Sequence, residues 1–217
     1  KHYDEVNWMY PVSIYTDVAL YPDERSYSVD AVYTLMNKSD SVVTRALIIE
    51  KKTITNIKLE RATLVNTDPI HGIFEFQFDT PVLPGDTVRL EFSADGSHKG
   101  LQSGNDLVDN GSYVHLRDFS PFLGYTQSLE IRNNTERNKR GLPRKSFERP
   151  SAADFDVMES GFGRVDFETI LSVPVSQTGI TVGRLEEEWT ENNRNYYLFS
   201  SQNPVAPAIS YHSGVYE

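Results

Sequence analysis

Apolar and polar residues alternate along most of the chain, which is the pattern of strands with one buried face. The alternation is clear over 12–20 and over 27–35, and the turn residues of 21–25 between them predict a hairpin. Further alternating stretches occur at 74–78, 88–92, 165–173, 180–182, 196–200 and 209–216. No window shows helical periodicity over three turns. The sequence therefore predicts an all-β fold, a β-sandwich of saddle-shaped sheets with long irregular loops.

Other stretches depart from simple alternation. Apolar residues occupy both odd and even positions within 41–50, which predicts a strand covered on both faces. Residues 93–112 are rich in Gly, Ser, Asn and Asp, so we expect a long loop that ends in a hairpin-type turn at Asn110-Gly111. Three glutamates at 186–188 lie beside Trp189 and precede a turn. No repeat and no linker divides the chain, so a single domain, 1–217, is predicted.

The segment 120–145 stands apart from these strands. It opens on a proline and a glycine, becomes polar and basic, and ends on Gly141-Leu142-Pro143. A long irregular segment held by a β scaffold is where binding residues are concentrated, although a solvated basic loop explains the composition equally well. Its basic residues are expected to pair with acids within the chain or to face a partner domain.

Charge and composition exclude several functions. The chain has 21 Lys and Arg against 31 Asp and Glu, a net charge of −10, which argues against a nucleic-acid partner. It has no cysteine, so disulfides, thiolate metal sites and cysteine nucleophiles are excluded. Asn-x-Ser/Thr triplets begin at Asn37, Asn110 and Asn133. Because the chain begins at Lys1 rather than Met, we expect it to be part of a longer protein.

Complete catalytic motifs are absent from the sequence. None of the five histidines is followed by Glu, and none has a second His within a helical turn, so H-E-x-x-H is missing. The serine motif G-x-S-x-G is missing as well. A calcium loop at 106–117 fails because Val108 and Arg117 occupy ligand positions. A pair of carboxylates for glycoside hydrolysis remains open, although nothing singles out a pair.

Several stretches together resemble a known family. PFLGYTQSLEIRNNTERNKRGLP, preceded by DNGSYVHLRDFSP, resembles the N-terminal β domain of aminopeptidase-N-like zinc peptidases, and most closely the branch fused to bacterial ABC-transporter permeases. TDVALYPDERSYSVDAVYTLMNKSDSVV is similar to the first hairpin of that domain, and TPVLPGDTVRLEFSADGSHKGL to its strand after a Pro-Gly turn. QTGITVGRLEEEWTENNRNYYLFSSQNPVAPAISYHSGVYE is similar to its closing strands, which in the family lead into the catalytic domain.

The resemblance implies candidate substrate-binding residues. In the family, a Glu or Gln of this domain accepts the free α-amino group of the substrate, and an Arg follows five residues later. Gln127 and Arg132 have this spacing, so Gln127 is the first candidate and Glu130 the second. The alternative is that Gln127 satisfies backbone groups of its own loop. Tyr125 is a further candidate beside the substrate, although it and Phe122 fit a packing role better, and Arg132 and Arg137 fit ion pairs with local acids.

Two functions of different classes follow. The first is a non-catalytic accessory domain of a membrane-associated zinc metallopeptidase, with zinc only in the missing catalytic domain and no cofactor in this chain. Its partners would be that catalytic domain, the transmembrane segments of the parent protein and a peptide, and its location extracytoplasmic in a bacterium. The second is a β-sandwich binding module of a transporter protein whose peptidase domain is degenerate or absent. A stand-alone hydrolase is a more distant third.

Overall fold

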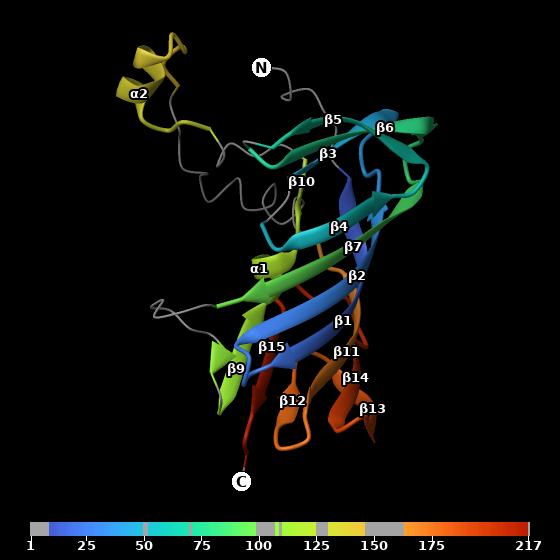
Figure 1. Cartoon of the computed structure of the whole chain (residues 1–217). Coiled ribbons are helices and arrows are strands. Elements are labelled where there is room, and N and C mark those ends of the chain that lie inside the picture. The colour runs from blue at the N-terminus through green and yellow to red at the C-terminus, as the bar shows by residue number, and fades with distance from the viewer. Residues whose placement is uncertain are drawn as a thin grey trace.

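The computed structural model describes residues 9–49, 52–69, 71–98, 107–108, 110–124, 130–145 and 163–216. Over these ranges the chain forms three β-sheets and two short helices, which confirms the predicted all-β fold. Figure 1 shows one sheet at the top of the molecule and the other two side by side below it. No helix within the described ranges has both the length and the apolar composition needed to cross a membrane.

The largest sheet has seven strands in the order β13-β14-β11-β1-β2-β7-β4. Its members are β1 (Tyr10–Tyr21), β2 (Ser26–Met36), β4 (Ile54–Leu59), β7 (Thr87–Ser97), β11 (Asp166–Pro174), β13 (Arg184–Glu191) and β14 (Arg194–Ser200). The predicted hairpin of β1 and β2 is confirmed, with Val18 opposite Val29. On its other side β1 pairs in parallel with β11, a strand from the far end of the chain.

Two four-stranded sheets complete the fold. The second sheet has the order β10-β3-β6-β5, formed by β3 (Val43–Ile49), β5 (Ala62–Asp68), β6 (Ile73–Val82) and β10 (Phe122–Leu123). The third sheet has the order β12-β15-β9-β8, formed by β8 (Leu107–Val108), β9 (Gly111–His115), β12 (Thr178–Ile180) and β15 (Ser210–Gly214). The helices are α1 (Leu116–Phe119) and α2 (Asn134–Lys139).

One continuous apolar core joins the three sheets. The inward-facing residues of the seven-stranded sheet pack against α1 and the inner face of the third sheet, with Phe119 and Tyr211 fully buried. A buried polar cluster crosses this core, where the Thr16 hydroxyl lies 2.8 Å from the hydroxyls of both Thr169 and Tyr211. Each of these three hydroxyls therefore has a partner, which offsets the penalty for its burial.

The structure corrects two expectations about element boundaries. Residues 93–97, expected in a loop, continue strand β7 and pair with β2, so the expected loop 93–112 is wrong at its start. Here Gly96 lies against the Tyr27 ring, leaving no room for a β-carbon. The acidic run 186–188, to which no strand was assigned, lies in β13 at the edge of the seven-stranded sheet. Because both faces of β13 are mostly exposed, its sequence shows no alternation.

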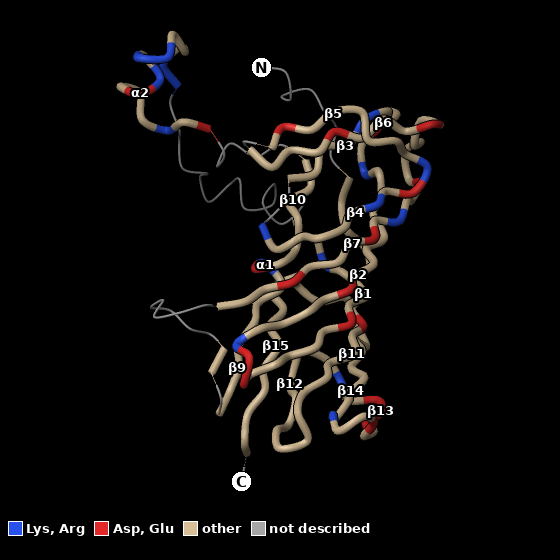
Figure 2. The backbone as a smooth tube through the Cα atoms, viewed as in Figure 1, with Lys and Arg blue, Asp and Glu red and all other residues tan. Residues whose placement is uncertain are grey.

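Charged residues are distributed unevenly among the sheets. Figure 2 shows acidic residues along the strands of the seven-stranded sheet and at β13, whereas α2 is basic and projects from the body at the upper left. The backbone of β12 and β15 is free of both colours. The net negative charge is therefore concentrated on the largest sheet, and the third sheet is a neutral region of the molecule.

Candidate functional site

The segment 116–124 fixes the start of the candidate site to the body. The His115 ring caps α1 by accepting from the Arg117 amide at 3.1 Å, and Asp118 accepts from the His115 amide at 2.9 Å. Phe119 is fully buried, and β10 then adds to the edge of β3. Gly124 ends this anchored part with a left-handed φ of 80° that favours glycine. The candidate loop thus leaves the second sheet from a defined point.

Two of the four candidate substrate-binding residues, Tyr125 and Gln127, lie outside the described residues. Their roles stay predictions. The chain is described again from Glu130, and both Glu130 and Arg132 can therefore be placed.

Glu130 holds two cations from the same short segment. Its Oε2 atom accepts from an Arg137 terminal nitrogen at 3.1 Å, and its Oε1 atom lies 2.5 Å from Lys145 Nζ. The Glu130 and Arg137 side chains are 16% and 9% exposed, so the charges are largely shielded from water. Two charge-assisted contacts in such a setting fix a carboxylate firmly. Both Glu130 oxygens are therefore engaged within the segment.

Arg137 is the centre of this arrangement, which we call the 130–145 knot. Besides Glu130, its guanidinium donates to the Pro143 carbonyl at 2.8 Å and to the Ile131 carbonyl at 3.2 Å. The ion pair with a local acid that was predicted for Arg137 is confirmed. The guanidinium fork supplies several donors in one plane, which suits it to tie separate turns of a loop together.

Asparagines close the knot at two further points. The Asn133 side chain caps α2 by accepting from the Thr135 and Glu136 amides. Two hydrogen bonds join Asn134 to Lys145. The Asn134 side-chain nitrogen donates to the Lys145 backbone carbonyl, and the Asn134 side-chain oxygen accepts from the Lys145 backbone amide. Sequence reasoning missed α2, although Asn133 followed three residues later by Glu136 is the pattern of a helix start. The contact between Asn134 and Lys145 has no comparable sequence signal.

Arg132 has a different setting from Arg137. It is exposed, and no ion pair is found for it within the parts of the chain that the structure describes. Phe122, expected to pack, is 45% exposed on β10. Arg140 and Arg144 are exposed as well, so the outer surface of the knot is basic. Chemically, the knot can present guanidinium donors on a rigid support.

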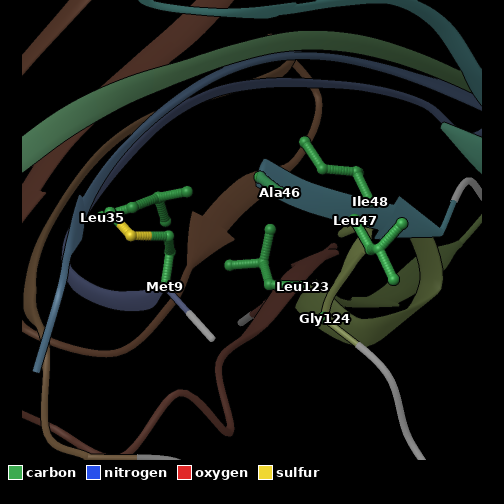
Figure 3. Close-up of a pocket in the computed structure, with 7 residues that line it drawn as sticks. All are labelled: Met9, Leu35, Ala46, Leu47, Ile48, Leu123 and Gly124. Atoms are coloured by element: carbon green, nitrogen blue, oxygen red, sulfur yellow. The ribbon is translucent and has the colours of Figure 1, made fainter. Parts of the chain in front are cut away.

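A small apolar cavity lies beside the start of the candidate loop (Figure 3). Met9, Leu35 and Leu123 point toward one another there, next to Gly124. Its volume is about 10 Å³, roughly what one water molecule requires. The cavity is therefore a packing defect between the second sheet and β2 and is too small to hold a peptide.

Metal-ligating side chains do not gather in the described ranges: no group of three or more His, Asp or Glu there could hold a metal ion. The histidines have other contacts. His71 pairs with Asp68 at 2.8 Å, and His115 caps α1. His212 lies on β15 with its Nε2 atom 3.0 Å from the Ser210 hydroxyl, and partial burial lowers its pKa.

The fold is similar to that of solved zinc metallopeptidases. No protein-family model and no curated protein matches the sequence. An M1 zinc metallopeptidase from Deinococcus radiodurans matches with a TM-score of 0.61 and 16% identity, over 96% of this chain and 42% of that one. A mutant from the same organism, bound to a Tyr-Ser-Ala substrate, matches with a TM-score of 0.61 and 16% identity, over 95% and 42%.

A third structure, a two-domain M1 zinc metallopeptidase mutant bound to L-tryptophan, matches with a TM-score of 0.59 and 15% identity, over 95% of this chain and 43% of that one. At such identity the likeness concerns the fold. The chain spans less than half the length of these structures.

Proposed function

We propose that this chain is a non-catalytic accessory β domain of an aminopeptidase-like zinc metallopeptidase, packing on a catalytic domain and lining its peptide cleft. The observation that carries the proposal is the fold, which matches M1 zinc metallopeptidases over 96% of this chain but only 42% of theirs. The sequence lacks both H-E-x-x-H and cysteine. Zinc ligands and the catalytic machinery would therefore come from the other domain.

The finer parts of the proposal rest on the sequence resemblance. Residues 109–143 and the stretches similar to the family's first hairpin and closing strands point to the branch fused to bacterial ABC-transporter permeases. On that basis the parent protein is membrane-associated, and this domain is extracytoplasmic. Membrane segments would then lie elsewhere in the parent protein.

Gln127 is the proposed acceptor for the α-amino group of the peptide. Glu130, the other candidate, already holds Arg137 and Lys145 and so serves as the anchor of the knot. Arg132 follows Gln127 by five residues and is exposed, which leaves its guanidinium able to orient the acceptor. Tyr125 would lie beside the same substrate end.

The alternative function is a binding module of a transporter protein without a working peptidase. The pairing of Glu130 favours this alternative. Glu130 is one of the two candidate acceptors for a substrate amine, and its carboxylate already binds Arg137 and Lys145. Both functions predict no turnover by the 217-residue chain alone. Only experiments on the parent protein can therefore distinguish the two functions.

The deciding experiment is to sequence the coding region on both sides of this chain and to express the longer product. The proposed function expects H-E-x-x-H with a further Glu after residue 217, one bound zinc by elemental analysis, and aminopeptidase activity that a chelator removes. Apolar runs of roughly 20 residues elsewhere would support the membrane link. Membrane runs without a zinc motif would instead support the binding module.

Within an active longer product, Gln127→Ala tests the amine site. We expect KM for peptides with a free amino terminus to rise by about 10- to 100-fold, since a hydrogen bond to a charged group contributes roughly 1.5–3 kcal/mol. Initial rates over a range of peptide concentrations measure it. The matched control is Gln202→Ala, a change at an exposed residue between β14 and β15. An unchanged KM for Gln127→Ala would contradict the assignment.

A further inference from the structure

The third sheet has an outer face without charge. Its four strands contain no Asp, Glu, Lys or Arg, in a chain of which 24% is charged. The inner face, with Leu107, Val114 and Tyr211, is buried in the core. The other side of these strands carries the exposed residues Val108, Tyr113 and Ile180 and the half-buried His212, and the exposed Tyr216 follows β15. We call this side the uncharged face.

The register brings these side chains together. Ile180 and Tyr113 both pair with His212, so the three form one row across β12, β15 and β9. The Tyr113 and His212 rings meet edge to face at 4.9 Å. Two residues further along β15, the Tyr216 ring covers Gly214. A β-carbon placed on Gly214 would lie 3.2 Å from that ring. The result is one apolar and aromatic surface.

This surface is open in the described structure. The exposed fractions are 38% for Tyr113, 39% for Val108, 44% for Ile180 and 56% for Tyr216. Single exposed apolar residues are normal, but a contiguous group that lacks charge is typical of the centre of a protein interface. Aromatic residues such as Tyr113 and Tyr216 are those that carry most interface energy.

The outer face of the seven-stranded sheet offers a contrast. Asp17 lies opposite Asp30 across β1 and β2, and Glu168 is two register positions from Asp17. Partial burial, together with the Asp30 charge, raises the pKa of Asp17. Like charges held this close favour contact with water rather than with an apolar partner. Of the two faces, the uncharged face is therefore the one suited to a protein domain.

We propose that the catalytic domain of the parent protein packs on the uncharged face. This inference rests on the proposed function, in which a second domain accounts for the length that this chain lacks relative to the M1 structures. Strand β15, which is part of this sheet, ends at Gly214, and the Tyr216 ring lies against that end. A domain joined to the chain after the closing strands could therefore reach the uncharged face through a short connection. The partner surface would be apolar, with an acceptor or donor for the Tyr113 hydroxyl and the His212 ring.

Two substitutions test the face in the longer product. Tyr113→Lys and Ile180→Lys each place a positive charge at the centre of the uncharged face. Val65→Lys is the control, because it places the same charge on β5 of the second sheet, at a residue that is 53% exposed. After cleavage of the connection between the domains, we expect the halves to stay associated in gel filtration for the wild type and Val65→Lys. Each variant of the face should weaken that association by about tenfold or more.

Hydrogen exchange provides a second measurement that does not depend on variants. Amides of 107–114, 178–181 and 210–216 should exchange more slowly in the longer product than in the 217-residue chain, with those of β1 and β2 unchanged. Protection of β1 and β2 instead would overturn this inference and leave the proposed function standing. A downstream sequence without a zinc motif would overturn both. Dimerisation of the 217-residue chain that Tyr113→Lys abolishes would assign the face to a second copy and so refute the inference.

Discussion

Asn37 is a single polar residue that the core depends on. Its side chain is fully buried just after β2 and donates to the carbonyls of Ser41 at 2.8 Å and Val82 at 3.0 Å. Its oxygen accepts from the Ser39 amide and hydroxyl. Asn37 begins an Asn-x-Ser triplet, yet its amide nitrogen has both protons in use in the folded chain. The triplet here marks a structural turn and does not offer an acceptor for a glycan.

Replacing Asn37 with alanine should lower the free energy of unfolding by about 2 kcal/mol, because the Val82 carbonyl would lose a buried donor. Urea unfolding followed by circular dichroism measures the change. Asn56→Ala is the control, since Asn56 is exposed on β4, and should shift the free energy by less than about 0.5 kcal/mol. Equal effects of the two substitutions would show that the Asn37 contacts contribute little.

Three buried tyrosines make stability depend on alkaline pH. Burial, with smaller contributions from Asp118 and Asp95, raises the pKa of Tyr27 to about 12 from its ordinary value of 10.0. Burial also raises the pKa of Tyr33 and of Tyr211. Above pH 10 these phenols ionise in the unfolded chain while the folded chain keeps their protons. The stability they provide is present below pH 10 and is lost as pH rises through the folded pKa values.

We therefore expect the free energy of unfolding to fall above about pH 10, by roughly 1.4 kcal/mol per pH unit for each tyrosine that keeps its proton. Urea unfolding at a series of pH values from 8 upward tests this. Tyr211→Phe should make the decline shallower, because it removes one of the buried phenols. A flat profile would mean that the buried phenols ionise freely in the folded protein.

The 130–145 knot is an element whose stability comes from side chains rather than from regular structure. Its helix has six residues, too few to be stable alone. Arg137, through its bonds to Glu130, Ile131 and Pro143, holds both ends of the segment to α2. Local opening of such an element need not unfold the sheets.

Arg137→Ala should open the knot without unfolding the domain. Removing one partner of a shielded ion pair costs several kcal/mol locally, so tryptic cleavage after Lys139, Arg140 or Arg144 should become at least about tenfold faster. Limited proteolysis with mass spectrometry measures the rates, and the melting temperature of the domain should change little. Arg132→Ala is the control, because Arg132 is exposed in the same segment. Equal cleavage of both variants would refute a central role for Arg137.

The whole molecule depends on pairing between the two ends of the chain. β11 lies between β1 and β14 in the seven-stranded sheet, and Thr169 on β11 holds the Thr16 hydroxyl. Tyr211 on β15 meets the same hydroxyl from the third sheet. Residues before and after the candidate loop therefore share one core, and the single domain stays a prediction.

A chain that ends at residue 162 should accordingly fail to fold. Strand β1 would expose a long edge, and Thr16 would lose both buried partners. Far-ultraviolet circular dichroism and a thermal melt of this truncated chain, beside the 217-residue chain, provide the test. A cooperative melt from the truncated chain would show instead that the chain contains two independent folding units.

Different parts of the candidate site were open to sequence reasoning to different degrees. The segment 120–145 could be recognised as irregular and basic, and the ion pair of Arg137 could be anticipated from the acids near it. The choice of Glu130 as its partner could not, because the chain must first turn through α2 to bring Arg137 and Lys145 to one carboxylate. Strand β13 escaped detection for a related reason, since an exposed edge strand has no buried face to leave a pattern.

Sequence patterns were enough to predict the all-β class and the β1–β2 hairpin, and to show that no complete zinc or serine motif is present. These follow from alternation, turn residues and residue spacing, which are local properties. Only the folded chain shows that β1 pairs in parallel with β11, that Thr16, Thr169 and Tyr211 meet in the core, and that the residues of the uncharged face lie together. These contacts join residues distant in the chain, and their partners are selected by packing of the whole core rather than by any local pattern.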